Sequence, residues 1–276
     1  MSRSEYFTQQ RLAQLEQSLS ERDIQVLASL KRCRYLTTLQ IARLHFDASV
    51  NSRAAVRASN RHLTRLRELG LIRALSRRIG GVRAGSGSFV WTLTAGGFRL
   101  LQPTDQPRKQ FREPTLHFLA HTLVISEAYL QLTEICAQHN MTLAGVQFEP
   151  GCWRRYTDKG GKPLILKPDL YAVTRGGGYE DHWFIEIDCD TETVARVVDK
   201  CERYLQYLHS GAEQAQTGVF PLVVWIVPDE KRKVSVERHI RAQISRGAEI
   251  FIVILPDELE ALVTGSYIQR VREDSG

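Results

Sequence analysis

Two short runs of uninterrupted apolar residues constrain most strongly how this chain can fold. They are PLVVWIV at 221–227 and FIVIL at 251–255. A strand with one face in water alternates apolar and polar residues, whereas a strand covered on both faces has no need to alternate. We therefore expect both runs to be inner strands of a sheet that helices cover.

The second half of the sequence alternates helical and extended patterns around these runs. The order is α-β-β-β-α-β with one added α-β pair, which predicts a mixed sheet flanked by helices over residues 115–270, in the α+β or α/β class. The expected helices cover 115–138, 191–209 and 232–246, and the expected strands cover 143–149, 163–173, 181–188, 219–227 and 249–254.

The first half has a different pattern, in which three helices precede a hairpin. SERDIQVLASL at 20–30 opens with a serine that can cap a helix, and LTTLQIARLHF at 36–46 offers Thr37 or Thr38 for the same purpose. A third helix begins near residue 51 and ends at Gly70. The strand patterns LIRALS and FVWTLT then flank a tip rich in glycine and arginine.

Positive charge is concentrated in this first half. Between Ala48 and Ser88 the chain carries nine arginines and one acid, Glu68. A local excess of this kind favours nucleic acid as a partner, because a basic surface attracts the phosphate backbone. The same arginines would also suit a solvated face without a partner.

Three helices and a hairpin, with LRELGLIRALS leading to WTLTAGG, resemble the winged helix-turn-helix modules of bacterial DNA-binding proteins over residues 20–101. The resemblance implies that a helix enters the major groove while the wing reaches phosphates or the minor groove. The candidate DNA contacts are Ser52, Arg53, Arg57, Asn60, Arg61 and Arg65 on the third helix and Arg77, Arg78 and Arg83 on the wing. The alternative is a module for protein docking or dimerisation.

Segments of other composition lie before and after this module. Residues 1–19 are polar and helical in pattern, which predicts an N-terminal helical extension. Residues 102–114 contain several prolines and many polar residues, which is typical of a linker. The start has no apolar core of the kind a signal peptide needs, and no run is long enough to span a bilayer, so we expect a cytoplasmic protein without a membrane partner.

Three acids interrupt the apolar strand patterns of the second half. Asp169 lies in LILKPDLYAV, and Glu186 and Asp188 lie in HWFIEID. A charge in such a context costs free energy unless it is paired or bound to a metal ion. Carboxylates at the ends of neighbouring strands would suit Mg²⁺ or Mn²⁺ and orient it against a phosphate.

The acids are similar in spacing to those of the PD-(D/E)XK nuclease superfamily, in which a Pro-Asp and an acid-x-Lys on adjacent strands meet at a metal site. Pro168-Asp169 matches the first part and Glu186 matches the acid, but Asp188 stands where the lysine belongs. At about 100° per residue, Lys200 falls on the flank of the next helix, from which it can lean toward the acids. The resemblance implies Asp169, Glu186, Asp188 and Lys200 as catalytic residues, and Asp169, Glu186, Asp188 and Glu127 as metal ligands.

Each of these residues also has an ordinary structural interpretation. Pro-Asp commonly makes a turn, and EIDCDT can cap the following helix through Asp190 and Thr191. Lys200 would equally suit an amphipathic helix on which the aliphatic stem lies along apolar surface and the ammonium reaches water. The five cysteines form no CxxC pair, which argues against a zinc ribbon and a disulfide framework.

Almost the whole chain after residue 20 resembles the replication-relaxation family of plasmids and integrated elements, through the winged helix and the phrases HTLVISEAYLQL, KPDLYAV and WFIEIDCDTETVARVVDKCERYLQY. The resemblance implies a role in plasmid replication or DNA relaxation. Together with the winged helix and the nuclease-like acids, it leads to the hypothesis of a protein that binds double-stranded DNA and nicks it with Mg²⁺. The alternative is a non-enzymatic replication initiator or transcriptional regulator whose second domain keeps the nuclease fold for dimerisation or partner binding. A homodimer and replication or mobilisation proteins are further candidate partners.

Overall fold

The protein is represented by a computed structural model that describes residues 8–46, 52–75, 89–102, 112–158, 160–190 and 192–266. The chain divides into two compact units, residues 1–130 and residues 131–276. The division falls inside the long helix α6, Leu116–Gln138, which contributes residues to both units. Within the described ranges, no helix is both long enough and apolar enough to cross a membrane.

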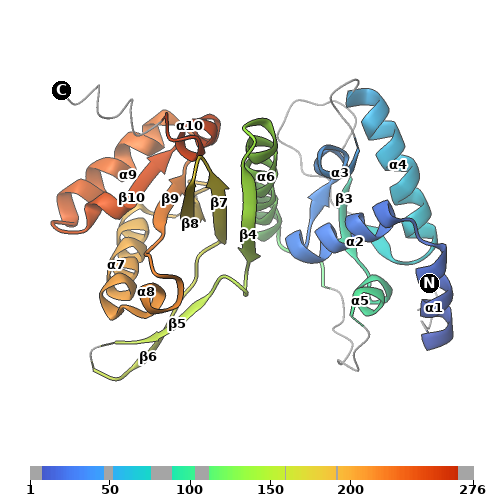
Figure 1. The fold of residues 1–276 in the computed structure, drawn as a ribbon, viewed down its shortest axis with the longest axis horizontal. Helices are drawn as coiled ribbons and strands as arrows, with labels where there is room; N and C mark the ends of the chain where they lie inside the picture. The colour runs from blue at the N-terminus through green and yellow to red at the C-terminus, as the bar shows by residue number, and fades with distance from the viewer. Residues whose placement is uncertain are drawn as a thin grey trace. The chain divides into compact units, whose positions relative to one another are not determined.

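Unit 1 consists of helices and one small sheet (Figure 1). The three-stranded sheet has the order β1-β3-β2, and both pairs are antiparallel. Besides the first part of α6, its elements are α1 Gln9–Ser18, α2 Glu21–Cys33, β1 Leu36–Thr37, α3 Thr38–His45, α4 Ser52–Glu68, β2 Ile72–Ala74, β3 Val90–Leu93 and α5 Ala95–Leu101.

The helices of unit 1 begin at the residues whose side chains can cap them. The Ser20 hydroxyl accepts a hydrogen bond from the Asp23 N–H, and the Asp23 carboxylate accepts one from the Ser20 N–H. Thr37 and Gln40 make the same reciprocal pair before α3. These capping boxes satisfy backbone donors that the first helical turn leaves unpaired, and they confirm the predicted helix starts.

A close backbone approach joins the end of α4 to the start of α5. The Thr94 hydroxyl donates to the Gly70 carbonyl oxygen at 2.5 Å, and it accepts from the Gly97 N–H at 3.2 Å. A side chain at Gly97 would place its Cβ 2.2 Å from the Leu71 carbonyl oxygen. Gly70 itself has φ of 75°, a conformation that favours glycine. Thr94 and Gly97 of the phrase WTLTAGG are therefore required by local packing in unit 1.

Asp23 is a buried acid on which α1, α2 and α4 converge. Its side chain is fully buried and accepts hydrogen bonds from Arg65 at 2.6 Å and from His62 at 3.2 Å, both on α4. Arg65 also donates to the Ser18 carbonyl oxygen at 2.8 Å. Burial raises the pKa of Asp23, but hydrogen bonds from Ser20, Arg65 and His62 outweigh this effect and lower the pKa to about 2.

Unit 2 contains a five-stranded mixed sheet with the order β10-β9-β8-β7-β4. The pairs β4–β7 and β7–β8 are antiparallel, and the pairs β8–β9 and β9–β10 are parallel. The remaining strands, β5 and β6, form a separate hairpin. The strands are β4 Thr142–Phe148, β5 Arg154–Thr157, β6 Pro163–Leu166, β7 Leu170–Gly176, β8 Tyr179–Ile187, β9 Leu222–Ile226 and β10 Phe251–Ile254, and the helices are α7 Val194–Ser210, α8 Ala212–Thr217, α9 Glu230–Gln243 and α10 Leu259–Val263.

The apolar run 221–227 forms the expected inner strand of this sheet, but the expectation of an inner strand was wrong for the run 251–255. β9 lies between β8 and β10, and Val223, Val224 and Trp225 are buried. β10 is buried at Val253 and Ile254 but lies at the sheet edge rather than inside it. Residues of α7 and α9 pack with β8, β9 and β10 in one apolar core. The mixed sheet and its helical cover confirm an α+β fold.

Two further expectations, a single strand at 163–173 and a helix cap at Asp190, were wrong. The expected single strand 163–173 is two strands, β6 and β7, in different sheets, because Pro168 lacks an N–H and ends the ladder before Asp169. Asp190 does not cap α7, which begins after Thr193 without a side-chain cap bond. Asp190 instead has φ of 55° and places its carboxylate 3.1 Å from Arg232.

Replacing the buried acid of unit 1 should destabilise that unit. We expect Asp23→Ala to lower the free energy of unfolding of unit 1 by about 3 kcal/mol, because Arg65 and His62 lose their partner and α2 loses half of its capping box. The folded-state pKa of Asp23 lies below its ordinary value, so its stabilisation is present above about pH 4 and is lost as the pH falls toward 2.

Amide hydrogen exchange in α2 and α4 of the full chain measures this change. The control is Glu21→Ala, which removes an exposed acid from the same helical turn and should cost less than about 1 kcal/mol. Equal losses in the two variants would show that Asp23 is no more important than a surface acid.

Candidate functional site

Glu186 is the fully buried centre of a polar cluster between β8 and α7. The Lys200 ammonium donates to its Oε2 at 2.5 Å, and the Tyr204 hydroxyl donates to its Oε1 at 2.5 Å. Lys200 and Tyr204 lie four residues apart on α7, so they share one side of the helix. The prediction that Lys200 leans toward the acids is confirmed in its geometry.

Asp169 lies beside Glu186 on the neighbouring strand. It immediately precedes β7, whose Leu170 is paired with Ile185, so the antiparallel register brings Asp169 opposite Glu186. Its Oδ2 accepts a hydrogen bond from the Ile187 N–H at 2.8 Å. The side chain is 8% exposed, which leaves it nearly as buried as Glu186.

Burial and charge act in opposite directions on the ionisation of this cluster. Burial, and to a smaller extent the charge of the nearby Asp169, raise the pKa of Glu186 to about 8 against the lowering effect of the Lys200 ammonium. Burial lowers the pKa of Lys200, but the carboxylates of Glu186 and Asp169 outweigh that effect and raise it above its usual range. The cluster therefore binds a proton tightly, and Lys200 provides the positive charge that makes its acids tolerable in the core.

Asp188 belongs to a different network. Its Oδ2 accepts from the Arg232 Nε at 2.7 Å, and its Oδ1 accepts from the Asp190 N–H at 2.8 Å. Arg232, near the start of α9, also donates to the Glu192 carbonyl oxygen at 2.8 Å. Asp188 therefore ties the loop after β8 to α9, and it does not substitute for the lysine of a nuclease motif.

Glu127 is engaged within unit 1. Its carboxylate accepts a hydrogen bond from the Gln40 side chain at 3.0 Å and forms an ion pair with Arg43. Both partners lie on α3. The predicted role of Glu127 as an additional metal ligand gains no support from these contacts.

The acids do not fit Mg²⁺ or Mn²⁺ in this arrangement. Mg²⁺ needs nearly octahedral oxygen coordination and usually keeps several waters. Both oxygens of Glu186 already accept hydrogen bonds in a fully buried position, and Asp188 is bound to Arg232. Across the described ranges of the chain, no group of three or more histidine, cysteine, aspartate or glutamate side chains is placed to hold a metal ion.

A basic surface on α4 is the second candidate site. Arg53, Arg57, Asn60 and Arg61 are exposed on one side of the helix, while Ala55, Ser59, Leu63 and Leu66 are buried on the other. At about 100° per residue, Arg67 falls on the same exposed side, near Arg53 and Asn60. Arg67 was not predicted from the sequence, because it does not fit the four-residue spacing of Arg53, Arg57, Arg61 and Arg65. An angle of about 100° per residue would have placed it on the exposed side.

Arg65 differs from the other predicted DNA contacts because its guanidinium is bound to Asp23 and Ser18. It fixes α4 against α2. The wing arginines Arg77, Arg78 and Arg83 lie outside the described residues, as does the side chain of Ser52. The site on α4 that the structure describes is therefore Arg53, Arg57, Asn60, Arg61 and Arg67.

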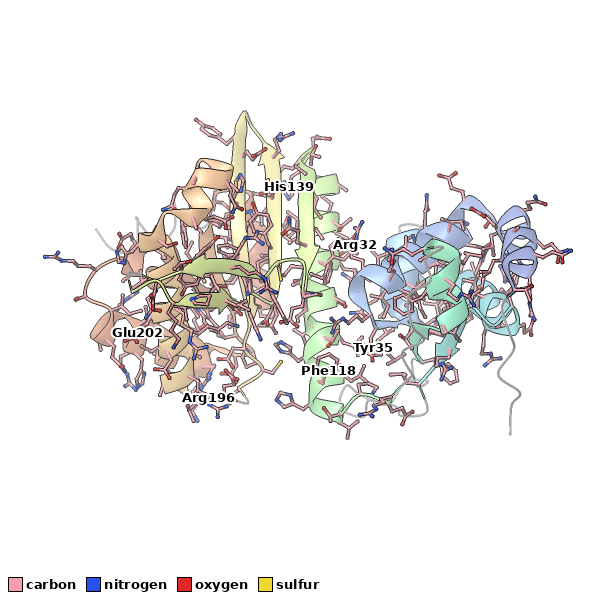
Figure 2. All side chains as sticks on the ribbon, turned by 90° about the horizontal axis from the view of Figure 1, so that it is seen from below. Arg32, Tyr35, Phe118, His139, Arg196 and Glu202 are labelled. Carbon is pink, nitrogen blue, oxygen red and sulfur yellow. The ribbon has the colours of Figure 1, made fainter. Side chains whose placement is uncertain are left out.

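The first part of α6 completes the core of unit 1. Leu119 and Leu123 pack with Leu75, which follows β2, and with Val90, the first residue of β3. Tyr35 and Phe118, both labelled in Figure 2, meet edge to face with their ring centroids 6.4 Å apart. The first part of α6 thus packs against the small sheet of unit 1.

These features define a two-unit α+β protein with a basic helical surface in one unit and a buried acid-lysine cluster in the other. Residues 27–223 match the family described as replication-relaxation, and because this match covers more than half of the chain, the protein belongs to that family. Family membership suggests a role in the replication or relaxation of plasmid or mobile-element DNA. No curated protein and no solved structure matches the chain.

Removing the lysine of the buried cluster should destabilise unit 2 in a pH-dependent way. In Lys200→Met, we expect Glu186 to lose its compensating charge and its folded-state pKa to rise further above its ordinary value. The stability that Glu186 contributes is fully present below the ordinary pKa of glutamate and is lost as the pH rises through the folded-state pKa, which is about 8 in the unmodified protein and higher in the variant. The loss relative to the unmodified protein should therefore be larger at pH 8.5 than at pH 5.5, by up to about 1 kcal/mol.

Urea unfolding followed by tryptophan fluorescence measures this effect, because Trp153, Trp183 and Trp225 all lie in unit 2. The matched control is Lys231→Met at an exposed position of α9. The same loss at both pH values would contradict the assignment of Lys200 as the counter-charge of Glu186.

Proposed function

We propose that this protein binds double-stranded DNA of a plasmid or mobile element and acts in its replication or relaxation as a non-enzymatic DNA-binding factor. The observation that carries the proposal is the exposed basic side of α4. Unit 1 supplies this helix as the recognition helix of a winged helix-turn-helix module, and its order of helices and antiparallel strands supports that interpretation.

The dimensions and chemistry of α4 suit the major groove. Its 17 residues give a length of about 25 Å at 1.5 Å per residue. Arginine recognises guanine through two acceptor atoms, and asparagine recognises adenine through a donor and an acceptor. Arg57, Asn60 and Arg61 would read base edges or phosphates, while Arg65 holds the helix in position through Asp23.

The second unit supports the DNA-binding unit without chemistry of its own. We propose that it keeps the core of a PD-(D/E)XK-like fold, in which Lys200 and Tyr204 now bind Glu186 as a structural cross-link between α7 and the sheet. Asp188, the third acid of the predicted metal site, is bound to Arg232 and so does not join the cluster around Glu186. This proposal follows the non-enzymatic alternative of the sequence analysis, in which the unit serves dimerisation or partner binding.

Removing arginines from α4 should weaken DNA binding. We expect Arg57→Ala/Arg61→Ala to raise the Kd for a duplex from the cognate origin at least tenfold at 0.1 M salt and to make the slope of log K against log salt shallower by about 2, because each lost phosphate contact removes about 0.9. Fluorescence anisotropy of a labelled duplex across a salt series measures both quantities.

The control for this experiment is Arg238→Ala/Arg246→Ala, which removes the same charge from exposed positions of unit 2. It should leave the affinity within about twofold. If the α4 variant bound DNA with unchanged affinity and slope, α4 would not be the DNA-binding helix.

The absence of nicking is a separate prediction. Supercoiled plasmid carrying the cognate origin, incubated with the protein and Mg²⁺ or Mn²⁺, should stay supercoiled, and Asp169→Asn and Glu186→Gln should behave like the unmodified chain. Agarose gels resolve the nicked product. Nicking that the unmodified protein performs and both variants lose would refute the non-enzymatic proposal and establish a metal-dependent nuclease site.

A further inference from the structure

The hairpin β5–β6 is a basic element in an otherwise acidic unit. Residues 131–276 contain 17 lysines and arginines and 22 aspartates and glutamates. Within them, residues 153–167 contain five basic residues, Arg154, Arg155, Lys159, Lys162 and Lys167, and a single acid, Asp158. The hairpin extends beyond the end of the five-stranded sheet in Figure 1. A local reversal of charge of this kind points to an anionic partner.

The single acid of the hairpin is used to shape its turn. The Asp158 Oδ1 accepts hydrogen bonds from the Gly160 N–H at 2.8 Å and from the Lys162 N–H at 2.9 Å. Both bonds are local to the turn, and in the described residues Asp158 forms no ion pair with Arg155, Lys162 or Lys167. The hairpin therefore keeps its positive charge.

One side of the hairpin anchors it to the unit. Arg154 donates from Nε to the buried carboxylate of Glu213 at 2.9 Å, and its guanidinium lies 4.6 Å from the centre of the Tyr171 ring. Tyr156 is buried, with its ring centroid 5.1 Å from that of Tyr207 on α7. β5 and β6 both contact α7. The position of the hairpin is thus set by buried contacts.

Cations on the far side of the hairpin and beside its turn face water. Arg155 and Ile165 are paired across the hairpin, and both are exposed, while Lys162 and Lys167 are exposed at the two ends of β6. Lys167 places its ammonium 4.4 Å from the centre of the Trp153 ring. In the part of the chain that the structure describes, no carboxylate forms an ion pair with Arg155, Lys162 or Lys167.

From this geometry we infer that the exposed side of the β5–β6 hairpin binds the phosphate backbone of double-stranded DNA, as a second contact surface beyond α4. Three cations on a fixed hairpin match the charge of successive phosphates, and phosphate contacts of this type add affinity and fix orientation without reading sequence. The inference rests on the proposed function in one respect, because it takes DNA as the ligand of the protein.

Neutralising the hairpin tests the inference in the full chain. We expect Arg155→Gln/Lys162→Gln to raise the Kd for a labelled duplex of arbitrary sequence about tenfold at 0.1 M salt and to make the salt slope shallower by about 2. Anisotropy titrations over a salt series measure both. Lys162→Gln alone changes one exposed residue beside the turn, should shift the slope by about 1, and keeps the test available if the double variant does not fold.

The matched control is Arg238→Gln/Arg246→Gln, which removes two exposed cations from unit 2. Arg238 lies on α9, and Arg246 lies in the segment that follows α9. An equal effect in this control would overturn the inference, because it would show that any lost charge in unit 2 acts alike. Unchanged binding by the hairpin variants beside weakened binding by Arg57→Ala/Arg61→Ala would overturn the hairpin contact alone. Unchanged binding by both would instead refute the proposed function.

Discussion

The contact between Glu186 and Lys200 is the constraint on which the structure of unit 2 depends. A buried carboxylate costs several kcal/mol unless a cation and hydrogen bonds compensate it. The lysine that compensates Glu186 comes from α7, so this helix must lie against the end of β8 in one rotation. Tyr204 then reaches the second carboxylate oxygen from the next turn of the helix. One polar cluster therefore sets the register between the helix and the sheet.

Two acids, the buried Asp23 and the partly buried Glu127, play a corresponding part in unit 1. Asp23 engages Arg65 and His62 of α4, and Glu127 engages Arg43 of α3. Both acids are thus bound by side chains of the same unit. Two groups of exposed cations remain on the exposed side of α4 and on the hairpin β5–β6. A polyanion such as DNA is the partner that this distribution of charge favours.

Local chemistry explains how much of this could be predicted from the sequence. Helix starts at Ser20 and Thr37 were predictable because a cap and its partner lie three residues apart. The place of Lys200 followed from helical geometry. In contrast, Arg65 meets Asp23 and Arg232 meets Asp188 across more than 40 residues of sequence, and no local pattern encodes such pairs. The contact of Asp188 with Arg232 could not be predicted from the sequence for this reason. The break between β6 and β7 could be, because Pro168 signals it.

Hydrogen–deuterium exchange of the full chain, with and without a cognate duplex and with and without Mg²⁺, tests the central claim most directly. That claim is that DNA binds through the basic surface while the acids of the sheet serve the fold. The account predicts slower exchange on adding DNA in peptides that cover α4, Ser52–Glu68, and no effect of Mg²⁺ on peptides that cover residues 183–188. Slower exchange around Glu186 that requires Mg²⁺, with no change in α4, would contradict it.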